Sequence, residues 1–263
     1  MSGLRSSEEH RCIALLYGIP MGNFYRSVLV EKILFYQRPL NPAHKFYLCT
    51  MVVLNDKLIF PPVETATPEG IIAIGGDLSM ERLLLAYRNG IFPWYSEGEP
   101  IVWWSPDPRF VLFPEKLRVT KSMQSVLNNG SFRFTINRAF TKVLQNCKTI
   151  HRKEQEGTWI TPAIEHAYTQ LHEQGYAHSA EAWQNGELVG GLYGIRIGNV
   201  FFGESMFSKQ SNASKFAFIN YVRQLQKENV MLIDCQVYTA HLESLGAGMI
   251  TRNKFMGLLA SNL

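Results

Sequence analysis

A predicted hairpin near residue 185 constrains the fold of this chain more than any other feature of its sequence. Asn185-Gly186 is typical of a two-residue hairpin turn, and apolar stretches at 178–183 and 188–195 flank it. We expect a further strand at 200–203, then a helix over 211–228 and a strand over 231–237. A local run of strands followed by a helix and a returning strand predicts an α+β domain.

Helix start signals precede this hairpin. Thr120 and Thr161 each supply a capping hydroxyl, and Pro162 stands at a first turn, so we expect helices ending at Gly130 and near Gln174. Between them the sequence predicts a strand over 132–136 and a helix capped by Asn137, and a short helix is expected earlier, over 80–90. This order is consistent with acyltransferase folds of the GNAT type, although fold alone does not give function.

The chain divides into three predicted parts. Residues 1–50 show turn signals at 18–20 and 39–42 but no clear periodicity, so we expect an appendage, with Met51 as an alternative start of the protein. Residues 51–112 are expected to form a small N-terminal domain and residues 113–263 the larger domain.

Composition excludes several classes of protein. The four cysteines are scattered singly without a CxxC pair, so neither a zinc site nor a redox motif is indicated, and no His spacing suggests a metal. No uncharged apolar stretch is long enough to span a bilayer, and no secretion signal is evident. We therefore expect a metal-free cytoplasmic protein that does not contact a membrane.

Charge is distributed unevenly in the second half of the chain. Residues 116–153 hold nine basic and no acidic residues, and residues 154–208 hold seven Glu against Arg196 alone. Two solvated faces of opposite sign would account for this. The functional alternative is a polyanion-binding surface beside a site for a cation, since Lys and Arg supply most non-specific affinity for nucleic acid.

Eight short motifs together resemble one family. In order they are residues 75–79 (GGDLS), 90–94 (GIFPW), 103–109 (WWSPDPR), 157–161 (GTWIT), 190–194 (GGLYG), 203–208 (GESMFS), 212–215 (NASK) and 232–236 (LIDCQ). Each motif alone is weak, but the ordered set, from about residue 58 to 255, resembles the leucyl/phenylalanyl-tRNA–protein transferases. Residues 1–50 match no family motif.

The resemblance implies both a reaction and a fold. Such enzymes move Leu, Phe and less readily Met from aminoacyl-tRNA to proteins with N-terminal Arg or Lys, which marks them for N-end-rule degradation. They combine a small N-terminal domain with a GNAT-like catalytic domain and use no coenzyme A or other cofactor. A basic surface would suit tRNA, and an acidic region would suit an Arg or Lys acceptor. The basic residues expected to contact tRNA are Lys116, Arg118, Lys121, Arg133, Lys142, Arg152 and Lys153.

Three polar residues are expected to be catalytic by this resemblance. Asp234 and Gln236 lie two apart on a predicted strand and so face one side of it. The Gln carbonyl can accept a hydrogen bond from an attacking amine, while Asp234 either holds the Gln amide or takes the proton itself. Glu204, beside apolar Phe201 and Phe202, needs hydrogen-bond partners, and we expect it to contact the terminal adenosine or the aminoacyl amine.

Apolar residues complete the expected site. Trp94 and Trp159 are the candidates for stacking on the terminal adenine, although three tryptophans within residues 94–104 can equally form a small core. The aminoacyl pocket is assigned by resemblance to Leu192, Phe201, Phe218, Tyr221 and Ile233.

Two other functions remain open on the sequence. A coenzyme A-dependent N-acetyltransferase would use residues 245–248 as a pyrophosphate loop, but Glu243 stands where such loops carry Gln or Arg. A tRNA-binding protein without catalysis would explain the basic block but not the presence of Asp234, Gln236 and Glu204 together.

Overall fold

The computed structural model describes residues 52–150 and 158–263. Residues 51–150 and 159–263 form one compact unit, and the following description concerns this unit. The expected appendage at 1–50 and the basic residues Arg152 and Lys153 lie outside the described residues. The proposed domain boundary near residue 112 stays a prediction.

The first sheet has four strands in the order β1-β2-β4-β3. Its strands are β1 (Val52–Leu54), β2 (Ile71–Gly75), β3 (Phe92–Pro93) and β4 (Val102–Trp104), with η1 (Val63–Thr65) before β2 and α3 (Met80–Arg88) after it. β1 pairs parallel with β2, and the other pairs are antiparallel. Trp103 and Trp104 lie on β4 and are buried, so these two tryptophans belong to the core of this sheet.

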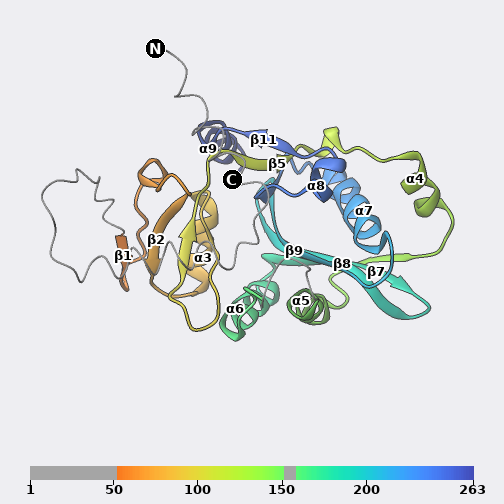
Figure 1. The fold of residues 1–263 in the computed structure, drawn as a ribbon, viewed down its shortest axis with the longest axis horizontal. Coiled ribbons are helices and arrows are strands. Elements are labelled where there is room, and N and C mark those ends of the chain that lie inside the picture. Colours follow the sequence, from red (N-terminus) through yellow and green to blue (C-terminus); the bar gives the residue numbers. More distant parts are fainter. Residues whose placement is uncertain (1–51, 151–157) are drawn as a thin grey trace, which may run out of the picture. The chain divides into compact units, whose positions relative to one another are not determined.

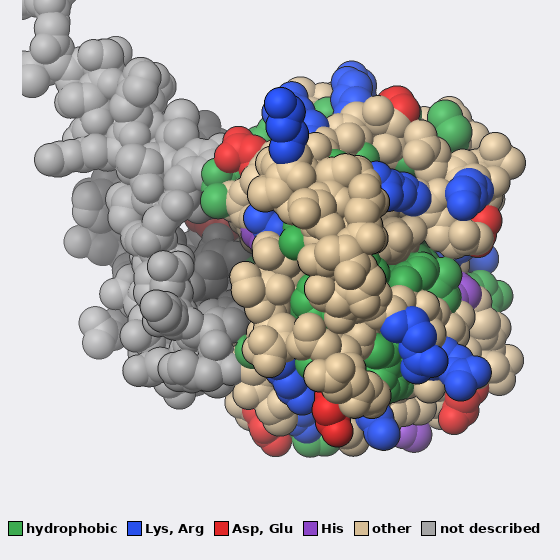
Figure 2. Space-filling model, turned by 90° about the vertical axis from the view of Figure 1, so that its right-hand side faces the viewer, with side chains coloured by type: hydrophobic (Ala, Val, Ile, Leu, Met, Phe, Trp, Pro, Cys, Tyr) green, Lys and Arg blue, Asp and Glu red, His purple; other side chains and the backbone are tan. Residues whose placement is uncertain are grey.

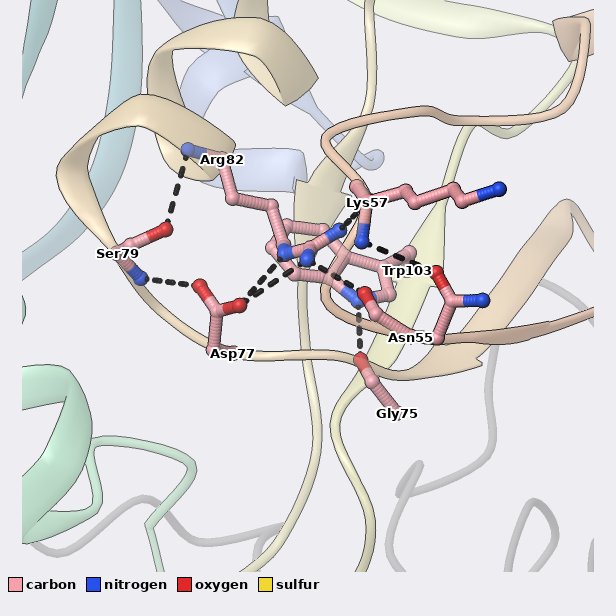
Figure 3. Close-up of polar contacts among 7 residues, drawn as sticks. All are labelled: Asn55, Lys57, Gly75, Asp77, Ser79, Arg82 and Trp103. Carbon is pink, nitrogen blue, oxygen red and sulfur yellow. Dashed lines mark hydrogen bonds and ion pairs between the residues drawn. The ribbon is translucent and has the colours of Figure 1, made fainter.

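A buried arginine, Arg82, ties the start of α3 to the chain that follows β1 (Figure 3). Its guanidinium donates to the carbonyl oxygens of Asn55 at 2.7 Å and Lys57 at 3.2 Å and pairs with Asp77 at 3.0 Å. Burial would raise the pKa of the Asp77 carboxyl, but hydrogen bonds from Arg82 and Ser79 outweigh it and lower that pKa to about 2. The GGDLS motif therefore has a structural role here.

Replacing Arg82 by leucine is expected to lower the free energy of unfolding by about 2–4 kcal/mol, because two carbonyl oxygens lose a charged donor. Urea unfolding would measure it. Asp77→Asn is the matched control: its side chain is 51% exposed, so we expect a loss of about 1 kcal/mol or less. Equal losses in the two variants would show that the carbonyl contacts contribute nothing.

The second sheet has seven strands in the order β11-β5-β10-β9-β8-β7-β6. They are β5 (Arg109–Leu112), β6 (Arg133–Ile136), β7 (Ala177–Gln184), β8 (Glu187–Ile197), β9 (Val200–Ser208), β10 (Leu232–Gln236) and β11 (Gly248–Ile250). All neighbours are antiparallel except β9 and β10, which run parallel and are joined through α7 (Ala213–Lys227). The predicted hairpin at 185–186 and its two strands are confirmed, and β9 extends five residues beyond the predicted end at 203.

Helices cover both faces of this sheet (Figure 1). α7 packs on one face, and α5 (Phe140–Thr149) and α6 (Pro162–Glu173) pack on the other. Two adjacent glycines of β8 permit this close packing: a Cβ on Gly190 would lie 2.6 Å from Ala213 of α7, and one on Gly191 would lie 3.3 Å from Val143 of α5. The remaining elements are η2 (Pro114–Lys116), α4 (Lys121–Asn128), α8 (Ala240–Ser244) and α9 (Arg252–Asn262).

The predicted caps are confirmed at Thr120 and Thr161, whose hydroxyl oxygens accept from the third residue of each helix. The prediction that Asn137 caps the next helix is wrong. Its amide oxygen accepts from the backbone of Ser179, and α5 begins only at Phe140. The buried carboxylate of Glu181 instead accepts hydrogen bonds from the backbone N–H groups of Arg138 and Ala139. A side chain of β7 therefore binds the backbone N–H groups just before α5.

Candidate active site

The candidate site lies where the parallel pairing of β9 with β10 stops. β9 and β10 run side by side as far as Phe202 and Asp234, and Glu204 and Gln236 follow two residues later on each strand. Just beyond the paired residues the two side chains meet: Gln236 Nε2 donates to Glu204 Oε1 at 2.9 Å.

A register irregularity occurs on each of these strands. On β9, Gly203 pairs with Gly194 and Ser205 with Tyr193, which leaves Glu204 as the extra residue. On β10, Asp234 and Gln236 pair with consecutive residues of β5, which leaves Cys235 as the extra residue. Bulges of this kind redirect side chains and occur often beside active sites. Simple alternation therefore does not predict how these side chains point.

Glu204 accepts hydrogen bonds from three elements. Tyr87 of α3 donates to Oε1 at 2.7 Å, Tyr168 of α6 donates to Oε2 at 3.1 Å, and the two tyrosine hydroxyls also contact each other. Burial raises the pKa of Glu204 to about 7, with the charge of Asp234 adding to the shift and the three hydrogen bonds opposing it. The pKa values of both tyrosines are raised well above their usual range, first by burial and then by Glu204. Glu204 can therefore change its charge near neutral pH while the tyrosines stay neutral donors.

Asp234 is held by an arginine that the sequence did not single out. Arg109 pairs with it through two hydrogen bonds, Nε to Oδ1 at 2.8 Å and Nη2 to Oδ2 at 2.7 Å, and both side chains are buried. The guanidinium lies between the rings of Phe92 and Phe255, 4.7 Å from each centroid. Asp234 Oδ1 also accepts the backbone N–H of Gln236 at 2.9 Å.

This arrangement corrects one expected contact. The Gln236 amide is held by Glu204, and Asp234 binds only the backbone of Gln236. The two residues also do not share a simple strand face, because the bulge lies between them and Gln236 has φ = 63°. An ionised Glu204 accepts only through its oxygens, so it fixes Nε2 toward itself and turns the Gln236 carbonyl oxygen away.

The five expected pocket residues gather in one apolar cluster on the α7 face of the sheet. They come from β8, β9, α7 and β10, and each is at most 4% exposed: Leu192, Phe201, Phe218, Tyr221 and Ile233. The rings of Phe201 and Tyr221 lie edge to face with centroids 5.0 Å apart. Met206, which follows Glu204 on β9, packs against the same cluster.

Trp94 and Trp159 are both half-buried, unlike Trp103 and Trp104. The carbonyl of Trp94 accepts from Trp104 Nε1 at 2.8 Å. The segments that carry Trp94 and Trp159 lie close together, because Tyr95 and Thr161 share a hydrogen bond of 3.1 Å.

The expected tRNA-binding residues do not form one patch. Lys116, Arg118, Lys121, Arg133 and Lys142 are all exposed. However, Lys121 begins α4, which packs against α7, whereas Lys142 lies on α5, which covers the opposite face of the sheet. On the face shown in Figure 2, Lys and Arg side chains are scattered with acidic side chains between them.

The acidic stretch is not a single surface either. Among the described residues, Glu165 is paired with Lys148 at 3.0 Å, and Glu181 is fully buried. Glu204 accepts hydrogen bonds from the two tyrosines and Gln236. A run of like charges in the sequence therefore does not become a cation-binding face in the fold.

Sequence reasoning missed three residues of this site: Arg109, Tyr87 and Tyr168. Arg109 carried a signal, since it is a charged residue that opens the apolar run Phe110–Leu112 and so needs a buried partner. The two tyrosines carried none, because a tyrosine at helical spacing predicts only a core position.

In the part of the chain that the structure describes, no helix is long and apolar enough to cross a membrane. Within the same residues there is no group of three or more His, Cys, Asp or Glu side chains that could hold a metal ion.

Two family models match the chain. The model of the leucyl/phenylalanyl-tRNA protein transferase N-terminal domain matches residues 76–107, and the model of leucyl/phenylalanyl-tRNA protein transferase matches residues 111–260. They follow each other in the order that the sequence predicts.

Curated relatives match over most of their own length. The leucyl/phenylalanyl-tRNA–protein transferase of Flavobacterium johnsoniae is 57% identical over 211 residues, which are 80% of this chain and 100% of that protein. The enzyme of the same name from Syntrophobacter fumaroxidans is 53% identical over 210 residues, 80% of this chain and 90% of that protein.

Solved structures match less closely. A GCN5-related N-acetyltransferase from Kribbella flavida is 10% identical, with a TM-score of 0.32 over 64% of this chain and 60% of that chain. A likeness of this degree carries no argument. The α+β fold class is confirmed by the two sheets and their helices. On the family models and the curated relatives, the chain belongs to the leucyl/phenylalanyl-tRNA–protein transferases, a family of aminoacyltransferases.

Proposed function

We propose that this protein transfers Leu, Phe and less readily Met from aminoacyl-tRNA to the N-terminal Arg or Lys of acceptor proteins. The observation that carries the proposal is the Glu204–Gln236 pair, which lies just beyond the paired part of β9 and β10. Phe201 and Ile233 of the apolar cluster come from the same two strands. The pair supplies an oriented hydrogen-bond acceptor, and the cluster supplies a place for an apolar side chain.

The reaction is aminolysis of an ester. The acceptor's α-amine attacks the aminoacyl carbonyl carbon, the bond from that carbon to the ribose oxygen breaks, and the ribose hydroxyl leaves with a proton. A free α-amine has a pKa near 8, so about a tenth of it is neutral at pH 7. Alignment of amine and ester is the main contribution asked of the enzyme, and it can reach about 7–11 kcal/mol in well-oriented cases.

Gln236 is the residue that we assign to the attacking amine. Its carbonyl oxygen is turned away from Glu204 and is available to accept an N–H of the amine. An amide is too weak a base to keep the proton, so its role is to orient the nitrogen lone pair toward the ester. Ionised Glu204 strengthens that acceptor through the amide, so it acts through Gln236 as a positioning residue.

Asp234 acts through Gln236 and is therefore a positioning residue. Arg109 binds both of its oxygens, and one of them also receives the Gln236 N–H, which holds the unusual backbone of Gln236. A proton transfer to Asp234 would break a buried ion pair, so we assign the proton to the ribose oxygen or solvent.

The apolar cluster is proposed to bind the amino-acid side chain. Phe218→Leu is expected to raise the ratio of kcat/KM for Phe-tRNA over Leu-tRNA about tenfold, because shape differences of a methylene or more are worth about 1–3 kcal/mol. Competition between the two charged tRNAs would measure it. Phe216→Leu is the control, since Phe216 lies two residues earlier on α7 and packs against Phe132. A change shared by both variants would count against a pocket at Phe218.

The remaining parts of the proposal concern substrates. Trp94 and Trp159 would hold the terminal adenosine, and exposed basic residues would contact tRNA phosphates. The product would carry a destabilising N-terminus that marks it for degradation in the cytoplasm. No coenzyme A, metal or other cofactor enters the scheme.

Peptides that differ in their first residue test the acceptor assignment. With Leu-tRNA as donor, we expect transfer to a peptide that begins with Arg or Lys and none to one that begins with Asp. Transfer to the Asp peptide alone would support the aminoacyl-transfer reaction but overturn the assignment of Arg and Lys as acceptors. No transfer to any peptide, with tRNA still bound, would overturn the proposed function.

A further inference from the structure

A second concave surface lies on the α5 face of the larger sheet. This groove, of about 470 Å³, is lined by Lys142, Asn146 and Thr149 of α5, by Trp183 and Glu187 of the β7–β8 hairpin, and by Lys209. Lys209 comes directly after β9 and five residues after Glu204, which corresponds to roughly 16 Å of extended chain. The groove is thus separate from the candidate active site, and β9 connects the two.

The ring of Trp183 is held in place by a partly buried polar relay. Trp183 Nε1 donates to Thr135 Oγ1 at 2.7 Å, and Thr135 in turn donates to Glu181 at 2.5 Å. Glu181 is fully buried and also accepts from Ser179 at 2.6 Å. Trp183 itself is half-buried, so this relay orients a ring that still lines the groove.

Three cations surround this ring. Lys142 and Lys209 line the groove, and Arg133 lies directly opposite Trp183 on the neighbouring strand β6, so the two side chains share a face. All three are exposed, and none forms an ion pair with any of the described residues. Among the residues that line the groove, Glu187 is the single acidic one.

We propose that this groove binds the aminoacyl-tRNA at a point beyond its terminal adenosine. Lys142, Lys209 and Arg133 would contact phosphates, and a base or ribose would lie against Trp183. The chemistry favours a nucleic acid, because an oriented aromatic ring among unpaired cations is how proteins hold single strands. The distance to Glu204 is within reach of the few unpaired nucleotides at a tRNA end. This inference rests on the proposed function for the identity of the substrate.

Charge substitution separates this groove from the site of chemistry. For Lys142→Glu/Lys209→Glu we expect KM for Leu-tRNA to rise about tenfold or more, with kcat unchanged and the salt dependence of binding reduced by about two contacts. KM for 3′-leucyl-adenosine, which cannot reach the groove, should stay the same. Lys227→Glu, an exposed lysine at the end of α7 on the other face of the sheet, should change neither value.

Trp183→Leu provides a second variant with a different signature. We expect it to raise KM for Leu-tRNA while leaving the salt dependence unchanged, since stacking carries no charge. Circular dichroism checks that both variants fold. If Lys142→Glu/Lys209→Glu does not fold, the neutral variant Lys142→Gln/Lys209→Gln takes its place.

An unchanged KM for full-length Leu-tRNA in the double variant would overturn the proposal. A raised KM for the acceptor peptide with an unchanged KM for Leu-tRNA would also overturn it, and would assign the groove to the acceptor protein. Fluorescence anisotropy with uncharged tRNA keeps this test independent of transfer. If wild-type protein transferred nothing but the double variant still lost tRNA affinity, the proposed function would fail and the groove would stand.

Discussion

Replacing Arg109 by methionine is expected to abolish most aminoacyl transfer and to lower the free energy of unfolding by about 3–5 kcal/mol. Asp234 is fully buried, and the change removes the partner of both its oxygens, so an uncompensated charge remains inside the protein. Methionine is a long, flexible side chain and is chosen to fill the space of Arg109 beside the rings of Phe92 and Phe255. A cavity would then not be the cause of the lost stability. Urea unfolding and transfer from Leu-tRNA to an Arg-first peptide measure the two effects.

A double variant distinguishes stability from positioning. In Arg109→Met/Asp234→Leu no buried charge is left, so we expect most of the stability to return, as it often does when apolar residues replace a buried ion pair. Transfer should stay low, because the Gln236 N–H has lost its acceptor. Recovery of transfer together with stability would show that Asp234 does not position Gln236.

The change Glu204→Gln is expected to lower kcat about 100-fold, because Gln236 loses an ionised hydrogen-bond acceptor, and such bonds are worth about 1.5–3 kcal/mol. Wild-type transfer should rise with pH through about 7 as Glu204 ionises, and again near 8 as the amine of the acceptor loses its proton. The variant should keep only the second rise. A wild-type profile with the single rise near 8 would remove the ionisation of Glu204 from the mechanism.

The same carboxyl makes stability depend on pH. Its pKa is raised in the folded protein from 4.5 to about 7, so between these values the folded state binds more protons than the unfolded state. The free energy of unfolding therefore falls as pH rises from about 4.5 to 7, by roughly 1–3 kcal/mol after allowance for the partial exposure of Glu204. Glu204→Gln should lack this fall and be more stable than wild type at pH 8. Parallel curves of unfolding free energy against pH for the wild type and Glu204→Gln would contradict this expectation.

Local patterns predicted much of the fold. The turn at Asn185-Gly186 and the caps at Thr120 and Thr161 are decided by neighbours in the sequence, and all three are confirmed. Asn137 failed because Glu181, 44 residues later, satisfies the backbone before α5. A cap supplied by another strand leaves no local signal.

Only some members of the candidate site were predictable from the sequence. The motifs pointed to Glu204, Asp234 and Gln236, and the strands do bring Glu204 to Gln236. The contact of Asp234 with Arg109 depends on β5 pairing with β10 across 125 residues, and two bulges set the side-chain directions. Neither long-range pairing nor bulges can be read from alternation, so the sequence left the roles of Asp234 and Gln236 open.

Single-turnover transfer of labelled Leu from Leu-tRNA to an Arg-first peptide, by wild-type protein and by Gln236→Ala in parallel, tests the central claim most directly. We predict transfer by the wild type, a rate at least about 100-fold lower for Gln236→Ala, and equal affinity of both proteins for tRNA. A variant that transfers within twofold of the wild type would contradict the claim that Gln236 orients the attacking amine.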